Sequence, residues 1–512
     1  MKIHNFLTQS REDAKTQNFY FLLFTFYFKT FAPLRLCVFA LILSVFNFAI
    51  FAQEQQPTPG AAKTVVIPAV KEKKLPNGLT VAVVERKNVP LVTIQLLIKS
   101  GANSEDATKA GLADMTASLL TKGTKTRSAT QIAEQIEFLG GSITTGAGWN
   151  NSVVTINVMA DKLDQAMAIL ADVVLNPAFK QEEIDLLKAQ TLDGLAYNLT
   201  QPGFLGNYVA SKYSFDEHPI GGTVESVKGI TREDIVGFKT SNYLSDVSTL
   251  IFTGDISSIK ANALTQKFFG GWRKPKPREK RINVITRVPD SLSVVKRILV
   301  VDLPDSGQAA VSYARNIRGV HRQDAEFYSS SVLNSVLGGG YSSRLNQEIR
   351  IKRGLSYGAG SSFAWRGWKT NFRTTTQTKN ESAAEVAELV AAEIKKLTDS
   401  NVSATELNPR KLVLNGDFGR DLETTNGLAG ALADLYVFGL PTSELNSYMK
   451  SVQAVTDTQV RDFAKQNLLG GDIIIVGDYA KFKDDLAKRF PNMTIDVIKA
   501  DELNLSKDNL RK

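Results

Sequence analysis

The sequence reads TREDIVGFKTSNYL over residues 231–244 and TDTQVRDFAKQNLL over residues 456–469. Five positions carry the same or a similar residue in both stretches, offset by 225: Thr231 and Thr456, Ile235 and Val460, Phe238 and Phe463, Asn242 and Asn467, Leu244 and Leu469. An apolar run that ends in Gly-Asp follows each stretch, at residues 250–255 and 473–478. Self-similarity at a fixed offset indicates two copies of one structural unit of roughly 220 residues.

The repeat suggests the domain boundaries. We expect an amino-terminal domain at residues 64–272 and a carboxy-terminal domain at residues 294–490, followed by a tail at 491–512. Residues 273–293 lie between the two copies and begin with a basic, proline-spaced run. Such composition between two repeats is typical of an exposed linker.

Each copy mixes strand and helix patterns. In the first copy, β-branched runs at 80–85 and 91–99 predict two strands paired as in a hairpin. Apolar spacing predicts helices at 110–120, 129–139, 162–175 and 181–199, and alternation predicts strands at 142–147 and 152–159. This order predicts an α+β fold in which each half is a mostly antiparallel sheet with helices on one face.

Composition excludes several kinds of site. The single cysteine, Cys37, excludes a disulfide framework within the chain and a cysteine-rich metal site. The histidines, His4, His218 and His321, are too scattered for a metal site local in sequence, and we expect the latter two at the surface or as caps. The formal net charge is +9, of which five basic and two acidic residues in the first 52 contribute +3. The remaining +6 is too small an excess to favour nucleic-acid binding.

Residues 1–52 have the features of a targeting segment. Lys29 and Arg35 precede an apolar run from Leu36 to Ala52, and the sequence turns polar at Gln53. This arrangement predicts either a signal peptide cleaved near Gln53 or an uncleaved membrane anchor. In both cases we expect the folded part outside the cytoplasm, behind a tether at residues 53–63.

The stretch Leu75-Pro76-Asn77-Gly78-Leu79, the helix expected at 110–120 and the duplication resemble the pitrilysin/insulinase family of zinc metallopeptidases, to which the mitochondrial processing peptidase belongs. The resemblance runs from about Leu75 to Phe490 and implies that family's fold of two homologous halves. In catalytic members a Gly-Leu-Ala stretch precedes a His-x-x-Glu-His motif. A further Glu on a later helix completes the ligand set.

All four motif positions are changed in this chain. The resemblance places Asp114 and Ser118 at the two histidines, Ala117 at the glutamate base, and Gly194, beside Asp193, at the third ligand. Catalytic zinc takes three protein ligands and an open position for water, and the base must accept a proton. Since Ala117 is no base and Gly194 has no side chain, we expect no metal or other cofactor in this chain. The zinc is expected in a partner subunit.

The second copy carries the other functional signal, in the stretch LGGGYSSRLNQEIRIKRGLSYG at residues 337–358. It resembles the carboxy-terminal half of the family, in which an Arg and a Tyr seven residues later reach toward the zinc site. Arg350 and Tyr357 have this spacing, and Arg353 does not. An arginine suits a substrate carbonyl or carboxylate, and a tyrosine hydroxyl suits the developing oxyanion. The alternative is that Arg350 is a surface cation and Tyr357 a core residue of a strand.

Two functional hypotheses follow from the resemblance. The first is a non-catalytic subunit of an exported heterodimeric insulinase-type metallopeptidase, inactive alone, that supplies Arg350 and Tyr357 to the zinc site of a homologous partner for peptide hydrolysis. The second is a pseudo-peptidase that binds peptides or scaffolds an envelope complex. The Arg/Tyr pair favours the first, because a pure scaffold needs neither residue. Both hypotheses place the protein in the periplasm or cell envelope, tethered to the membrane if the amino-terminal segment is uncleaved.

Overall fold

The computed structural model describes residues 67–273 and 293–512. The expected targeting segment at 1–52, the tether at 53–63 and most of the expected linker lie outside these residues. Residues Thr64–Lys512 form one compact unit. Across 67–273 and 293–512, no helix is long and apolar enough to cross a membrane.

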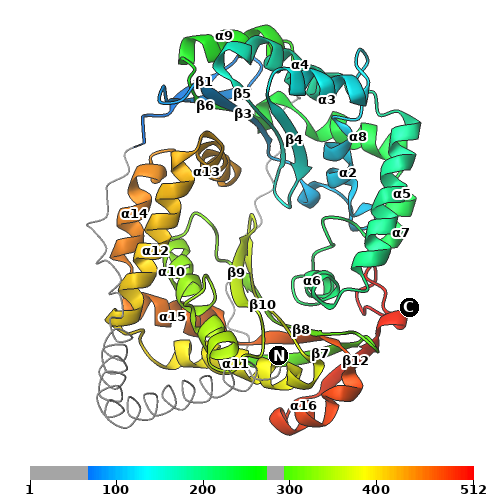
Figure 1. Ribbon diagram of the computed structural model, residues 1–512, viewed down its shortest axis with the longest axis vertical. Coiled ribbons are helices and arrows are strands. Elements are labelled where there is room, and N and C mark those ends of the chain that lie inside the picture. The colour runs from blue at the N-terminus through cyan, green and yellow to red at the C-terminus, as the bar shows by residue number, and fades with distance from the viewer. Residues whose placement is uncertain (1–66, 274–292) are drawn as a thin grey trace, which may run out of the picture. The chain divides into compact units, whose positions relative to one another are not determined.

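The first half builds a six-stranded sheet in the order β1-β2-β6-β3-β5-β4 (Figure 1). Its strands are β1 (Lys71–Lys74), β2 (Thr80–Glu85), β3 (Leu91–Ile98), β4 (Ser142–Ala147), β5 (Ser152–Met159) and β6 (Ser248–Gly254). Its helices are α2 (Leu112–Leu119), α3 (Ala129–Phe138), α4 (Leu163–Leu175), α5 (Gln181–Asn198), α6 (Pro202–Tyr213), α7 (Val224–Gly229), α8 (Arg232–Asn242) and α9 (Ser258–Phe269). Only β2 and β6 pair in parallel, and the other neighbours are antiparallel.

The second half builds a second six-stranded sheet in the order β12-β7-β11-β8-β10-β9. Its strands are β7 (Val295–Asp302), β8 (Ala309–Arg318), β9 (Ala359–Trp365), β10 (Lys369–Thr378), β11 (Gly471–Gly477) and β12 (Ile495–Lys499). Its helices are α10 (Glu326–Leu337), the π-helix η5 (Asn346–Ile351), α11 (Ala383–Asp399), α12 (Ala404–Glu423), α13 (Thr425–Phe438), α14 (Glu444–Ala454), α15 (Asp457–Asn467) and α16 (Lys483–Arg489). Here β7 is parallel to both β11 and β12.

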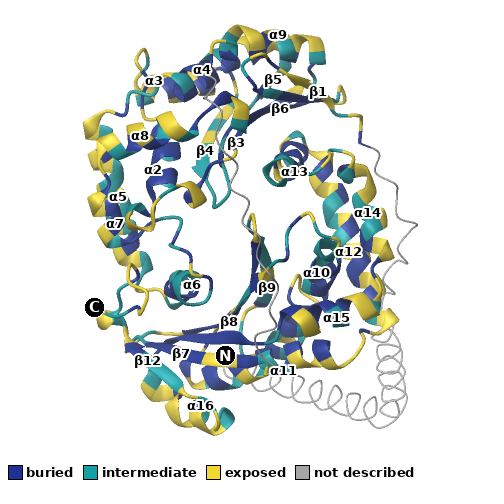
Figure 2. Cartoon of the chain, turned by 180° about the vertical axis from the view of Figure 1, so that it is seen from behind, coloured by how far each residue is buried: buried dark blue, intermediate teal, exposed yellow. Residues whose placement is uncertain are grey.

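The two repeat stretches occupy equivalent places, which confirms the α+β fold of two homologous halves. Thr231 caps α8 by accepting a hydrogen bond from the backbone N–H of Asp234 at 3.2 Å, and Thr456 caps α15 by accepting one from Gln459 at 3.1 Å. Each helix leads to a strand that is buried throughout, β6 or β11, and each of these strands is third in its sheet. Figure 2 shows the central strands of both sheets as buried.

One sequence-based prediction about strands is wrong, and one strand is missed. The strands at 80–85 and 91–99 do not form a hairpin, because β6 lies between β2 and β3 and pairs with both. The segment expected as a tail at 491–512 contains a strand that the sequence analysis did not predict: β12 pairs with β7, and Leu510 is fully buried. In both cases the deciding contact is with a strand far away in the sequence, which local periodicity does not reveal.

Helices of its own half cover one face of each sheet, and a helix of the opposite half packs on the other face (Figure 1). Leu428 and Leu432 of α13 pack on Val84 and Ile251 of the first sheet. In the second half, Leu205 and Val209 of α6 pack in the same way on Leu299, Ile474 and Val476. Because α6 and α13 occupy corresponding places in the repeat, the exchange is reciprocal. Burial of these apolar side chains holds the two halves together.

Candidate functional site

The four degenerate motif positions lie on two helices that pack together. Asp114, Ala117 and Ser118 lie on α2, and Gly194 lies on α5. Ala117 is fully buried, whereas Asp114 and Ser118, four residues apart on one helical face, are partly exposed. The structure therefore brings the α2 and α5 positions to neighbouring elements, as the resemblance implied.

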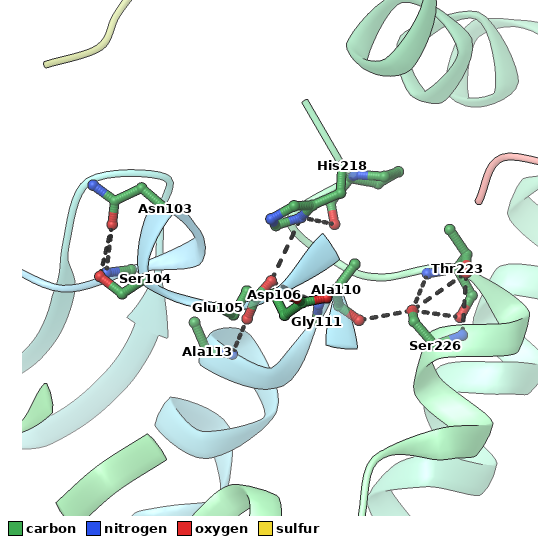
Figure 3. A network of polar contacts seen from close by, with 12 residues as sticks. Asn103, Ser104, Glu105, Asp106, Ala110, Gly111, Ala113, His218, Thr223 and Ser226 are labelled. Carbon is green, nitrogen blue, oxygen red and sulfur yellow. Dashed lines mark hydrogen bonds and ion pairs between the residues drawn. The ribbon is translucent and has the colours of Figure 1, made fainter. Parts of the chain in front are cut away.

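A buried carboxyl group caps the start of α2. Glu105 accepts hydrogen bonds from the backbone N–H groups of Gly111 at 2.9 Å and Ala113 at 2.5 Å (Figure 3). Gly111 has φ +95°, and a Cβ there would lie 3.1 Å from the Cα of Gly222, so this close approach requires glycine. The Glu105 side chain is fully buried, and burial raises its pKa to about 8 despite the backbone donors.

His218, expected at the surface or as a cap, is largely buried and lies against this cap. Its Nδ1 is 3.6 Å from Oε1 of Glu105, its ring centroid is 5.0 Å from that of Trp149, and its side chain is 11% exposed (Figure 3). Burial lowers the pKa of His218, which favours the neutral ring. His321, in contrast, lies at the surface, where its backbone N–H donates to Asp324.

The donors around α2 do not fit a catalytic zinc ion. Burial raises the pKa of Asp114, which favours the neutral form of its carboxyl. Ser118 offers only a neutral hydroxyl, and Gly194 offers nothing. Within residues 67–273 and 293–512, no group of three His, Cys, Asp or Glu side chains is placed to hold a metal ion. Asp114 and Ser118 together fall short of the three protein ligands that such a site needs.

Arg350 and Tyr357 lie on the segment that joins α10 to β9. Arg350 is in the last turn of η5, and its carbonyl accepts the N–H of Gly354 at 3.0 Å. Gly354, at φ +63°, ends the helix, and Tyr357 follows two residues before β9. The Tyr357 side chain is 90% exposed, so the alternative that it is a core residue of a strand is wrong.

An aromatic ring that the sequence reasoning missed lies under Arg350. The guanidinium carbon is 5.1 Å from the ring centroid of Tyr341, which is itself exposed. Among the residues that the structure describes, Arg350 has no carboxylate partner, whereas Arg353 pairs with Glu348 and Glu385. Of the two arginines, Arg350 is therefore the one whose charge is not already neutralised.

One buried amide fixes this segment. Nδ2 of Asn346 donates to the carbonyl of Tyr341 at 2.5 Å, and Oδ1 accepts the N–H of Ala359 at 3.4 Å. Thr378 of β10 adds a hydrogen bond to the carbonyl of Leu355 at 2.6 Å. The turn before η5 and the loop before β9 are thus held to each other around Arg350. In the sequence, the only signal for Tyr341 was its place directly after three glycines.

Two protein-family models match the chain: "Insulinase (Peptidase family M16)" over residues 80–199 and "Peptidase M16 inactive domain" over residues 229–412. Together they cover more than half of the chain. The chain belongs to the insulinase family. The first match contains the four degenerate motif positions, and the second contains Arg350 and Tyr357.

Relatives within the insulinase family carry contrasting names. An uncharacterised zinc protease of Mycobacterium leprae is 28% identical over 414 residues, which cover 77% of this chain and 88% of that protein. A non-peptidase homologue of Helicobacter pylori, YmxG, is 22% identical over 421 residues, which cover 80% of this chain and 94% of that protein. The crystal structure of a peptidase M16 inactive domain from Pseudomonas fluorescens matches with a TM-score of 0.72 and 25% identity, over 80% of this chain and 98% of that one.

Proposed function

We propose that this insulinase-family chain is the zinc-less subunit of an exported two-chain metallopeptidase, and that it supplies Arg350 and Tyr357 to the zinc site of a homologous partner. The observation that carries the proposal is the contrast between the halves. In the first half, α2 and α5 present no three-ligand set. In the second half, a positioned segment presents a tyrosine that is 90% exposed and an arginine without a carboxylate partner among the described residues.

The chemistry of the two side chains fits peptide hydrolysis. The guanidinium of Arg350 can donate two parallel hydrogen bonds to a substrate carbonyl or carboxylate. The hydroxyl of Tyr357 can donate to the oxyanion that develops on the attacked carbonyl. The ring of Tyr341 orients Arg350 through a cation–π contact, which contributes about 0.5–1 kcal/mol at an exposed site. This chain thus binds substrate and donates hydrogen bonds, and the metal chemistry belongs to the partner.

The proposed location and partner rest on the sequence. The basic and apolar pattern of residues 1–52 supports export to the periplasm or cell envelope. The proposed substrates are peptides, as the family resemblance implies. The partner is expected to be a homologous subunit with an intact His-x-x-Glu-His helix.

The second candidate is a pseudo-peptidase that binds peptides or scaffolds an envelope complex without assisting hydrolysis. Similarity to the Helicobacter pylori protein named a non-peptidase homologue, and to the Pseudomonas fluorescens structure named an inactive domain, supports this candidate. Under both candidates, this chain alone does not catalyse peptide hydrolysis.

Co-expression with a homologous zinc-motif-bearing subunit tests the proposal. Each chain alone should show little hydrolysis of a fluorogenic peptide library, and the assembled complex should hydrolyse it. In the complex, Arg350→Ala should raise KM and lower kcat, because it removes a charge-assisted contact to substrate. Arg353→Ala is the matched control, since its guanidinium is already paired with Glu348 and Glu385. A stable complex in which Arg350→Ala and Arg353→Ala are equally active would favour the scaffold.

A further inference from the structure

A buried arginine in the second half forms no direct ion pair with any described residue, although the charge of Glu406 acts on it. Arg410 of α12 is 8% exposed, and within the described residues it pairs with no carboxylate. Its guanidinium donates to the hydroxyl of Ser342 at 2.8 Å and to the Ser342 carbonyl. Burial lowers the pKa of Arg410, and the charge of Glu406 opposes this shift only in part. Burying a charge outside an ion pair costs free energy, and an anion bound beside Arg410 would offset this cost.

The natural intrahelical partner of Arg410 is engaged elsewhere. Glu406 lies four residues earlier on α12, a spacing that brings side chains together on one helical face. Both of its oxygens, however, accept from Arg344 at 2.8 Å, in a two-pronged pair. Glu406 therefore makes its direct contacts with Arg344, and its charge acts on Arg410 without a hydrogen bond between the two.

Arg410 and Ser342 line a cavity of about 550 Å³ between the segment around η5, α11 and the start of α12. The other charged side chains of its lining form pairs: Arg344 with Glu406, Lys352 with Glu348 at 2.8 Å, and Lys396 with Glu393 at 2.6 Å. Four cations thus face three carboxylates, and the one cation left over is Arg410. The cavity carries a single excess positive charge, placed at a buried guanidinium with planar donors.

We propose that this cavity binds one oxyanion group, a carboxylate or a phosphate, through Arg410. Arginine suits this ligand because its fork of N–H donors matches two oxygens of a carboxylate or phosphate. Arg344, held in place by Glu406, adds positive potential without being the primary contact. Neither Arg350 nor Tyr357 lines this cavity, so binding there can be tested on the isolated chain.

Calorimetric titration and thermal unfolding of the purified chain at constant ionic strength test the site. The probes are acetate, inorganic phosphate, a tripeptide with a free carboxyl terminus, and the same tripeptide amidated. The oxyanion probes should bind and raise the unfolding temperature, and the amide should do neither. Equal responses to acetate and the tripeptide acid would identify the oxyanion alone as the ligand, and tighter binding of the tripeptide acid would identify a peptide end as its source.

Arg410→Gln should weaken oxyanion binding by at least about tenfold, because it removes a charged donor pair. Arg410→Lys, which keeps the charge but loses the fork, should bind with intermediate affinity. Arg420→Gln is the matched control on the same helix, since Arg420 is exposed and pairs with Asp417. The proposal is overturned if no oxyanion binds the wild-type chain, if the amidated tripeptide binds as well as the acid, or if Arg410→Gln binds like the wild type.

Discussion

The carboxylate of Glu217 in the first half lies 3.0 Å from Nζ of Lys369 in the second half, and both side chains are 4% exposed. Arg366 also donates to Glu217, from Nη2 at 3.0 Å. Burial opposes ionisation of Glu217, but the two cations overcome it and hold its pKa below the ordinary value of 4.5. These ion pairs connect the two halves in addition to the apolar contacts of α6 and α13. Glu217 directly precedes His218 in the sequence.

Glu217→Gln should destabilise the folded chain by about 3–5 kcal/mol, because the buried Lys369 and the partly buried Arg366 lose their counter-charge. Urea unfolding at pH 7 measures the difference, with the exposed Glu423→Gln as control. Since the folded pKa is depressed, the stabilisation is present above about pH 4.5 and is lost as pH falls below it. The wild type and Glu217→Gln should therefore converge in acid. A loss at pH 7 no larger than that of the control would show that these ion pairs do not hold the halves together.

Glu105→Gln should change how stability depends on pH. The folded pKa of about 8 lies above the ordinary 4.5, so the folded chain binds more protons between these values. Stability therefore falls as pH rises through this window, by at most about 1.4 kcal/mol per pH unit, and levels off above it. The glutamine variant lacks this titration, so its stability relative to the wild type should rise from pH 5 to pH 8. If the stability–pH curves of the wild type and Glu105→Gln are parallel, the pKa of Glu105 is not raised in the folded chain. Glu137→Gln, at an exposed glutamate, provides the reference curve.

Asn346→Ala should loosen the segment that carries Arg350. The change removes the hydrogen bonds to the Tyr341 carbonyl and the Ala359 N–H and should cost about 1–3 kcal/mol. Amide hydrogen exchange should accelerate in residues 341–359 and stay unchanged in the first half. Asn401→Ala, which removes an exposed contact to Asp457, is the control. Unchanged exchange in the segment would show that Asn346 does not position it.

The isolated chain should bind no stoichiometric zinc, because α2 and α5 offer fewer than three ligands. Elemental analysis after dialysis measures the bound metal, and a zinc-motif-bearing relative prepared in parallel is the positive control. Retention of about one zinc ion per chain would contradict the conclusion that the residues around Asp114 cannot hold zinc.

The sequence was most informative about local structure and about the repeat. The strands at 142–147 and 152–159 have the predicted bounds, and the predicted helices lie within one or two residues of α2, α3, α4 and α5. These elements are set by short-range periodicity and by caps such as Ser128 of α3, which a sequence displays directly. The same holds for the duplication, since Thr231 and Thr456 cap equivalent helices.

Contacts between distant segments were not predictable in this way. The insertion of β6 between β2 and β3, and the exchange of α6 and α13 between the halves, depend on which apolar surfaces meet after collapse. At the candidate site, the spacing of Arg350 and Tyr357 identified the segment that carries them. It did not predict that the ring of Tyr341 lies beneath the arginine. The contact between Glu105 and His218 was missed because the two residues lie 113 positions apart in the sequence and meet only at the cap of α2.

The turnover of Tyr357→Phe in the assembled complex with a zinc-bearing partner tests the central claim most directly. The substitution removes one hydroxyl, and because the side chain is 90% exposed it should leave folding and assembly unchanged. Loss of one oxyanion donor should reduce kcat by about 10²–10³, whereas Tyr197→Phe, at another exposed tyrosine, should not. Full turnover by Tyr357→Phe, in a complex shown to be assembled and to contain zinc in the partner, would contradict the account.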